Sequence, residues 1–212
     1  MDKKIKLKKG GWQANVEYFE GYVVKTPKTE TEIREKIKKH YTSLEGLEKK
    51  VKKLQEDWEN SLKIVKSGKV PLSLLAYPQF IKGGKIKQKR VKMLAEEFNE
   101  LISNNKFTEA KKLVDKVIDF IITLWKYGVH ETTFKFYSEM GLLDDGIVLV
   151  DMGELTDDKE VVRKQLLKGN KKLEDLRHHH HNEVLDYYQE QIKRRLTIKA
   201  LDKVWRSKLI KF

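Results

Sequence analysis

The stretch GIVLVDMGEL, residues 146–155, decides how the rest of the chain is interpreted. Its four apolar residues at 147–150 are typical of a fully buried strand. They end abruptly at Asp151, and Gly153 follows, where a glycine frees the backbone to turn. Two interpretations compete. Either Asp151 caps the turn after a buried strand, or it is a metal ligand held at the end of that strand.

The composition limits the class of protein. The 212 residues suffice for one sizeable core or two small domains. No apolar run is long enough to span a bilayer, and the basic N-terminus MDKKIKLKKGG lacks the apolar core of a signal peptide. The chain has no cysteine, which excludes disulfides and cysteine zinc sites. We therefore expect a cytoplasmic protein.

The charge is unevenly distributed along the chain. A net charge of +13 favours polyanionic partners, including nucleic acid, although a lysine-rich solvated surface also explains it. Residues 81–92 hold six basic residues and no acid, whereas residues 139–160 hold eight acids and a single lysine. Because the second segment reverses the sign of the whole chain and contains Asp151, it indicates a local function.

Periodicity predicts the elements of the N-terminal part. Alternating and β-branched residues at 3–8 and 16–26 predict a hairpin that turns through GGWQAN, and Pro27 ends its second strand. Thr29 or Thr31 is expected to cap the helix that follows. Apolar residues at helical spacing then predict helix over 30–66, with a possible break at 43–46.

The second half of the chain reads as mainly helical. Strand-like residues at 70–81 turn at Gly83-Gly84, and a strongly amphipathic helix is expected over 107–128. Residues 129–145 are irregular or weakly helical, and a short hairpin is expected to turn at Asp145-Gly146. Helices then predominate from about residue 158. Segregated strands and helices indicate an α+β fold.

The order of these elements resembles the protein-kinase fold. It comprises a glycine turn, a strand ending in VVK, an acidic helix, a long helix and a hairpin ending in Asp-x-Gly. LWKYG at 124–128 and LVDMGEL at 149–155 resemble a compact bacterial kinase-like family with a degenerate catalytic loop. The resemblance implies a small N-terminal antiparallel β lobe with a helix over residues 1–86, which binds nucleotide. A larger, mainly helical C-terminal lobe would occupy residues 87–212.

The resemblance implies ATP and Mg²⁺ as cofactors. Asp151 stands where kinase-like enzymes carry the aspartate that binds magnesium, with Met152 in place of phenylalanine. The asparagine that would bind a second magnesium is missing, and its place falls on Glu139. Magnesium prefers hard carboxylate oxygens, so both residues are candidate metal ligands.

Lys25, at the end of GYVVK, is the candidate phosphate ligand. In the kinase-like interpretation it reaches the α- and β-phosphates and pairs with a helix carboxylate, for which we expect Glu35, or second Glu32. Alternatively, Lys25 is an edge lysine that discourages strand addition. Gly10 and Gly11 do not form GxGxxG, but a glycine pair can still bring backbone amides near a phosphate.

The expected catalytic loop departs from the kinase pattern. No His-Arg-Asp occurs, and its place falls in GVHETTFKF, residues 128–136. Glu131 is the nearest carboxylate that could orient an acceptor hydroxyl, and His130 could be the base instead, although a lone histidine there is more often structural. The run of four histidines at 178–181 offers adventitious metal binding at most, because only its first and last members share a helix face.

Three functions remain open from the sequence. The first is a kinase-like ATP-binding phosphotransferase whose acceptor is a small molecule or a protein. The second is a kinase fold that binds nucleotide or a partner without catalysis, which the missing catalytic-loop residues favour. The third is a basic nucleic-acid-binding protein, supported by charge alone.

Overall fold

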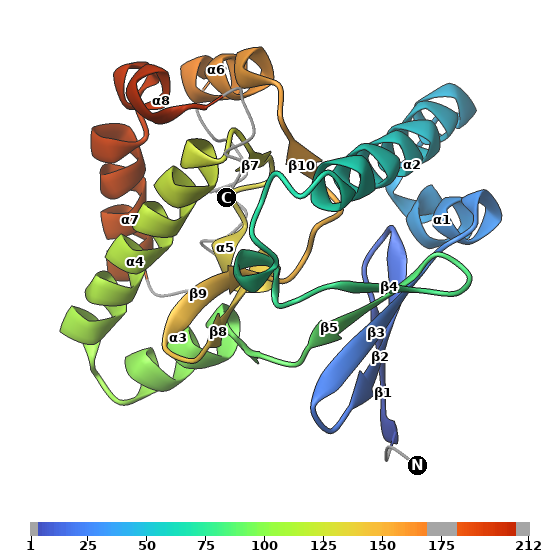
Figure 1. The fold of residues 1–212 in the computed structure, drawn as a ribbon, viewed down its shortest axis with the longest axis horizontal. Helices are drawn as coiled ribbons and strands as arrows, with labels where there is room; N and C mark the ends of the chain where they lie inside the picture. Colours follow the sequence, from blue (N-terminus) through green and yellow to red (C-terminus); the bar gives the residue numbers. More distant parts are fainter. Residues whose placement is uncertain (1–3, 169–181, 207–212) are drawn as a thin grey trace.

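The computed structural model describes residues 4–168 and 182–206. Its N-terminal part is a five-stranded antiparallel sheet with two helices beside it, and its C-terminal part is mainly helical (Figure 1). The predicted α+β arrangement is therefore confirmed. In spatial order the strands of the large sheet are β1 (Lys4–Gly10), β2 (Ala14–Phe19), β3 (Tyr22–Pro27), β5 (Lys85–Lys89) and β4 (Gln79–Ile81).

The expected single strand over residues 16–26 is wrong, because the structure divides it into β2 and β3. Glu20 and Gly21 form the turn between them. The rings of Phe19 and Tyr22 stack across this turn with their centroids 4.5 Å apart. Two strands with a tight turn share the aromatic and β-branched composition of one long strand, so the composition alone does not locate the turn.

The helical segment after Pro27 breaks at residues 38–43, slightly earlier than the expected 43–46. Thr29 caps α1 (Glu30–Ile37) in a reciprocal capping box with Glu32, and Ser43 caps α2 (Leu44–Lys66). A short 3₁₀ turn, Lys38–His40, joins the two helices. Their facing sides bury a small separate hydrophobic cluster formed by Ile33, Ile37, Leu47, Val51 and Leu54.

The strand-like segment over residues 70–81 is mostly not a strand. Leu72–Leu75 form a 3₁₀ helix, and Ala76 and Tyr77 follow with φ angles of 54° and 53°. This left-handed backbone ends the 3₁₀ helix and turns the chain, so only β4 remains extended. The turn expected at Gly83-Gly84 is confirmed, and both glycines have positive φ.

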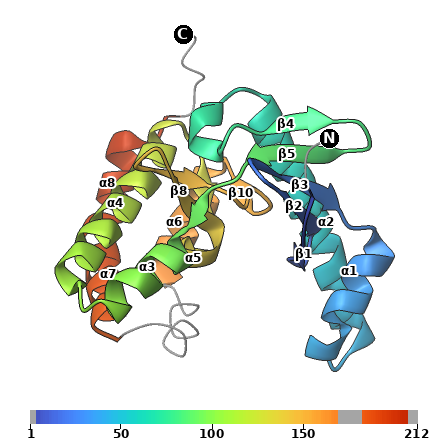
Figure 2. The ribbon, with the colours of Figure 1, turned by 90° about the horizontal axis from the view of Figure 1, so that it is seen from below.

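The C-terminal part packs around α4, which carries more buried side chains than any other element of this part. Trp125 on α4 and Tyr188 on α7 are fully buried at its centre. Figure 2 shows this helical group on one side of the molecule and the large sheet with α1 and α2 on the other. The helices are α3 (Leu94–Ser103), α4 (Phe107–Lys126), α5 (Phe136–Glu139), α6 (Lys159–Lys168), α7 (Asn182–Arg195) and α8 (Ile198–Val204).

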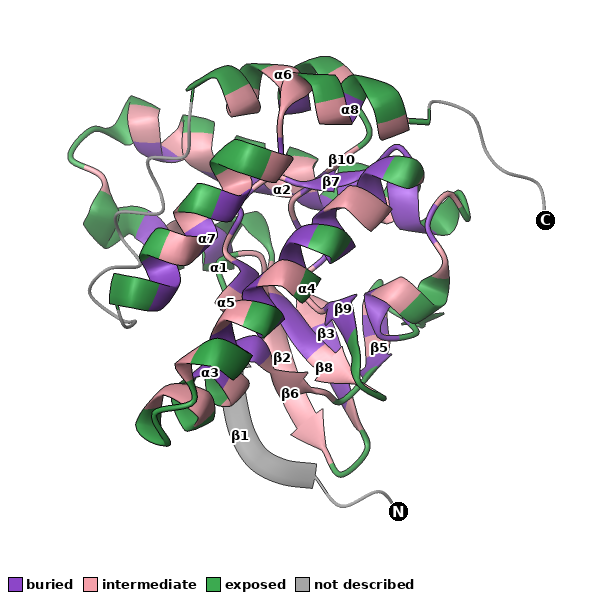
Figure 3. Ribbon diagram, turned by 90° about the vertical axis from the view of Figure 1, so that its left-hand side faces the viewer, coloured by how far each residue is buried: buried purple, intermediate pink, exposed green. Residues whose placement is uncertain are grey.

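The buried residues lie on the sides of the helices and strands that face one another. In Figure 3 the inward-facing turns of α4 and the strands β3 and β9 are buried, whereas α6 and α8 present many exposed residues. One hydrophobic cluster runs from Ala14 and Ile86 in the large sheet to Leu201 in α8, so a continuous core joins the two parts. None of the helices in the described ranges is long and apolar enough to cross a membrane.

Two small sheets position the acidic segment. One has the order β6-β8-β9, with β6 (Lys92–Met93), β8 (Met140–Leu143) and β9 (Gly146–Leu149), and the other pairs β7 (His130–Glu131) with β10 (Leu155–Thr156). The predicted β8–β9 hairpin is confirmed, but its turn lies one residue earlier than expected. Asp144 and Asp145 occupy the turn with φ of 49° and 62°, which aspartate tolerates better than most residues.

Two sequence-based expectations stay untested. The division into lobes at residues 1–86 and 87–212 is a prediction, and β5 runs across that boundary. The histidine run at 178–181 lies outside the described residues.

Candidate nucleotide and metal site

Lys25 and Asp151 meet, although 125 residues separate Lys25 from the neighbouring Val150. Lys25 lies on β3, and its side chain is only 6% exposed. Its Nζ donates to the carbonyl of Val150 at 2.7 Å and lies 3.7 Å from Asp151 Oδ1. A buried ammonium needs such partners, because its desolvation is otherwise uncompensated. The ion pair joins the large sheet to the end of β9.

Asp151 is held firmly by its backbone, while its carboxylate stays accessible. The amides of Val150 and Asp151 both donate to the carbonyl of Glu139, at 2.7 and 3.1 Å. Asp151 Oδ1 accepts the amide of Gly153 at 3.2 Å. The side chain nevertheless remains 43% exposed. Asp151 therefore caps the turn after β9 and still offers carboxylate oxygens to a ligand.

The turn that contains Gly10 and Gly11 is tied to the Asp-x-Gly segment. Gln13, which follows this turn, donates through Nε2 to the carbonyls of Gly153 and Leu54, at 3.1 and 2.9 Å. Both glycines are exposed. The β1–β2 turn, the end of β9 and helix α2 are thus connected through one amide group.

Helix α2 also binds the segment after Asp151 directly. The Ser61 hydroxyl accepts the amide of Leu155 at 2.8 Å, and Trp58 packs against Gly153. A Cβ on Gly153 would lie 2.3 Å from Gln13 Oε1 and 3.3 Å from the Trp58 ring. Three elements meet over Gly153, and its φ is not in the left-handed region, so the close packing is what excludes a side chain here.

We expect Gly153→Ala to lower the free energy of unfolding by about 1–3 kcal/mol, as overpacking does. Gln13→Ala removes the closest contact with the added methyl group, so the double variant should lose less stability than the sum of the two single variants. Urea unfolding of the four proteins measures this coupling. Additive losses would mean that Gln13 does not press on Gly153.

Glu139 lies beside Asp151, as the metal hypothesis requires. Burial raises the pKa of the half-buried Glu139 carboxyl well above its usual value, and the charges of Asp151 and Glu131 raise it further. The Glu139 carboxylate accepts a hydrogen bond from the Ser138 hydroxyl, at 3.0 Å. No group of three or more His, Cys, Asp or Glu side chains that could hold a metal occurs within residues 4–168 and 182–206. Two carboxylates with few protein ligands are what magnesium commonly uses.

The expected pair between Lys25 and Glu35 is wrong. Glu35 is exposed on α1 and forms an ion pair with Lys38 in the next turn of the chain. The second choice, Glu32, is engaged in the capping box with Thr29. The phase of α1 explains both outcomes, since Ile33 and Ile37 occupy its buried face and turn Glu35 toward solvent.

Glu131 is not placed as an open catalytic base. Only 3% of the residue is exposed, and its two carboxylate oxygens accept the amides of Thr133 and Phe134 at 2.6 and 2.9 Å. Burial raises the pKa of Glu131 to about 7, against the lowering effect of those hydrogen bonds. Glu131 therefore shapes the loop after β7, and an acceptor hydroxyl cannot reach it without rearrangement.

This burial predicts a dependence of stability on pH. From the ordinary glutamate pKa of 4.5 up to about 7, folded Glu131 keeps a proton that the unfolded chain releases. Stability should therefore fall as the pH rises through this interval, by up to about 3 kcal/mol. We expect Glu131→Gln to lose less stability than the wild type between pH 5 and pH 7.5 in urea titrations. Parallel curves would contradict the raised pKa.

His130 is buried, and its ring accepts a hydrogen bond. It is 1% exposed, and its Nδ1 accepts a hydrogen bond from the Trp125 indole at 3.0 Å. Because Nδ1 is an acceptor, the neutral ring carries its proton on Nε2. Burial lowers the pKa of His130 to about 3, so the ring does not take up a proton at neutral pH. A role of His130 as a base stays a prediction, and it would require this buried ring to become accessible.

Two glutamines that sequence reasoning missed belong to this site. Gln13 was described above. Gln88 on β5 is 1% exposed and donates to the carbonyls of Leu75 and Val150, at 2.9 and 3.2 Å. Its Oε1 is buried without a hydrogen-bond partner in the part of the chain that the structure describes. Neither glutamine has a sequence signal, because each acts through backbone carbonyls that are distant in sequence.

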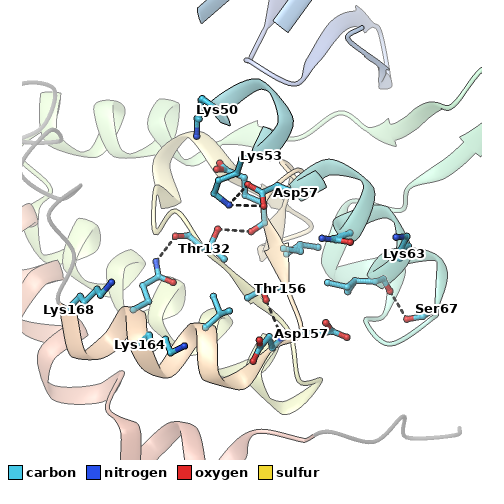
Figure 4. A pocket seen from close by; sticks show the side chains of 17 residues that line it. Lys50, Lys53, Asp57, Lys63, Ser67, Thr132, Thr156, Asp157, Lys164 and Lys168 are labelled. Carbon is cyan, nitrogen blue, oxygen red and sulfur yellow. Dashed lines mark hydrogen bonds and ion pairs between the residues drawn. The ribbon is translucent and has the colours of Figure 1, made fainter. Parts of the chain in front are cut away.

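A large open pocket lies on the other side of the segment after Asp151. It has a volume of about 1430 Å³ and is lined by α2, α6 and residues 154–158 (Figure 4). Thr132 and Glu154 line it, and the Thr132 amide and hydroxyl both donate to the Glu154 carbonyl. Lys25, Asp151 and Glu139 are not among its lining residues. The pocket and the Lys25–Asp151 pair are therefore neighbouring but separate features.

Comparisons with known proteins find only a distant likeness. No protein-family model matches the chain, and no curated protein matches it. Among solved structures, the bifunctional kinase-methyltransferase WbdD matches with a TM-score of 0.44 and 10% sequence identity. The match covers 85% of this chain and 43% of that protein, so the chain spans less than half of WbdD. At this level the likeness concerns the fold alone and carries nothing about activity.

Proposed function

We propose that this protein is a kinase-like, ATP-binding phosphotransferase. The observation that supports this most is the contact of Lys25 on β3 with Asp151 directly after β9. In protein kinases a lysine on the third strand and the aspartate of Asp-Phe-Gly act together on the nucleotide phosphates and their magnesium. The acceptor is a small molecule or a protein, and its identity does not follow from these residues.

The donor set fits magnesium and phosphate. Asp151 and Glu139 offer hard carboxylate oxygens, and a bound cation would offset the burial and the Asp151 charge that raise the pKa of Glu139. Lys25 would bind phosphate oxygens, and the backbone amides near Gly10 and Gly11 would add donors. Magnesium, when bound, would neutralise phosphate charge that develops during transfer.

The buried state of Glu131 does not oppose transfer. Phosphoryl transfer proceeds through a loose transition state, so positioning and charge stabilisation contribute more than proton abstraction does. In this proposal Glu131 fixes the loop that carries Thr133 and Phe134, and it does not touch the acceptor. Lys25, Asp151 and Glu139 hold the groups that react.

A second candidate is a kinase-like protein that binds nucleotide without transfer. The observation in its favour is that the two candidate bases are both buried and hydrogen-bonded, Glu131 to amides of its own loop and His130 to Trp125 on α4. The two candidates share the nucleotide site and differ in turnover.

Thermal unfolding with and without ATP and magnesium tests the shared site. A ligand that binds only the folded state raises the melting temperature. We expect a rise with millimolar ATP and Mg²⁺ or Mn²⁺, and a smaller rise with ATP and a metal chelator. No shift under any of these conditions would reject both candidates. A shift without phosphate transfer or ATP hydrolysis would leave the second.

A further inference from the structure

The pocket between α2 and α6 has a distinct chemistry. Figure 4 shows lysines from α2 and from α6 on the two sides of the segment around Thr156 and Asp157. The lining contains no aromatic side chain, whereas Ile64, Leu155 and the 42%-exposed Val161 supply an apolar portion. The full set of basic lining residues is Lys50, Lys53, Lys63, Lys164 and Lys168.

Most acids of the pocket are already engaged. Asp57 forms an ion pair with Lys53 at 2.8 Å, and Asp157 forms one with Lys69 at 3.2 Å. Asp158 accepts the Glu160 amide at 2.8 Å, as a residue at a helix N-terminus does. Among the acids of the lining, Glu154 and Asp158 have no ion pair within the described ranges. The lysines of the lining outnumber these two carboxylates, so the pocket keeps an excess of positive charge.

Three lysines of the lining have no ion pair or hydrogen bond within the described ranges. Lys63 lies on α2, and Lys164 and Lys168 lie on α6, one helical turn apart on the same face. Like charges at this spacing destabilise a helix, and an anion between them removes the repulsion. Ammonium groups facing one space from two helices are suited to an anion with more than one charged group.

We propose that this pocket binds a small molecule that carries at least two phosphate or carboxylate groups. The volume of about 1430 Å³ exceeds what a single inorganic anion needs, and the apolar patch at Val161 would accept a nonpolar part. The absence of aromatic lining residues opposes stacked single-stranded nucleic acid as the occupant. The site does not depend on nucleotide binding at Lys25.

Calorimetric titration of inorganic pyrophosphate into the metal-free protein tests the proposal. Wild type should bind, and Lys164→Gln/Lys168→Gln should weaken binding about tenfold, because two charged contacts are lost. Lys63→Gln, on the opposite wall, should weaken it about threefold. The matched control is Lys112→Gln/Lys116→Gln on α4, which also removes two exposed lysines one turn apart. It should leave binding within about twofold of wild type.

A further variant distinguishes pyrophosphate binding in this pocket from binding at the nucleotide site. Because Lys25 is itself the proposed phosphate ligand, the titration is repeated in a Lys25→Met background, where the loss of about tenfold in Lys164→Gln/Lys168→Gln should persist. Equal losses in the α6 and α4 double variants would show that binding follows net charge, and would overturn the proposal. Loss in Lys25→Met alone, or no binding by wild type, would overturn it as well. None of these results depends on whether ATP binds.

Discussion

Asp151→Asn is expected to abolish metal-dependent nucleotide binding and to reduce any phosphate transfer by at least about 10²-fold. Asparagine keeps the oxygen that accepts the Gly153 amide at 3.2 Å, so the turn after β9 should survive. What disappears is the negative charge beside Lys25 and Glu139. Magnesium then loses its most exposed carboxylate ligand. The measurements are the melting-temperature shift with ATP and Mg²⁺, and transfer or hydrolysis of radiolabelled ATP.

The chain provides a matched control on the same hairpin. Asp145→Asn also replaces an aspartate by asparagine, at an exposed turn position whose φ of 62° asparagine tolerates. It should behave as the wild type. If Asp151→Asn also retained the full nucleotide effect, Asp151 would only cap its turn. Because the Asp151 side chain does cap the turn after β9, the test has to remove its negative charge while keeping the capping oxygen.

Local chemistry made much of the fold predictable. Thr29 with Glu32 marks a helix start through a reciprocal cap, and Gly83-Gly84 marks a turn that needs positive φ. The helix over 107–128 was predictable because its apolar face repeats with helical period. These signals involve residues within a few positions of one another, so one sequence contains them completely.

The sequence-based predictions fail where the local structure depends on a contact distant in sequence or on an unusual backbone angle. Ala76 and Tyr77 adopt left-handed angles that no local pattern demands, and they end the segment expected to be a strand. Glu35 was chosen for its distance from Lys25 along the chain, whereas the buried positions of Ile33 and Ile37 orient the helix. A choice based on those two isoleucines would have placed Glu35 in solvent.

The candidate site was predictable only where its residues have a local sequence signal. Asp151 has a local signal, an apolar strand that ends in Asp-x-Gly, and Lys25 has one in the strand that carries it. Gln13 and Gln88 have none, because each binds backbone carbonyls that any residue would supply. The burial of Glu131 and His130 likewise depends on packing from α4 and α7, which the loop sequence does not contain.

Lys25→Met is expected to remove nucleotide binding without lowering the stability of the unliganded protein. Methionine fits the same apolar path, and removing a buried ammonium removes its desolvation cost. The carbonyl of Val150 keeps a donor, since Gln88 Nε2 lies 3.2 Å away. Asp151 is 43% exposed and can be hydrated. The melting temperature without ligand should therefore stay the same or rise, while the shift with ATP and Mg²⁺ should disappear.

Opposite changes in stability and binding distinguish a functional lysine from a structural one. If Lys25 only held the sheet to β9, Lys25→Met would lower the melting temperature and leave the shift with ATP intact. Lys85→Met is the control for lost charge, because Lys85 lies on β5 of the same sheet and its side chain has no hydrogen bond or ion pair among the described residues. It should keep the full shift. Replacing the buried Lys25 by an apolar residue need not lower folding stability, because its partner Asp151 is 43% exposed and can be hydrated. The retention of the charged pair is then explained by what it binds, and a stable Lys25→Met variant that still binds ATP would contradict that explanation.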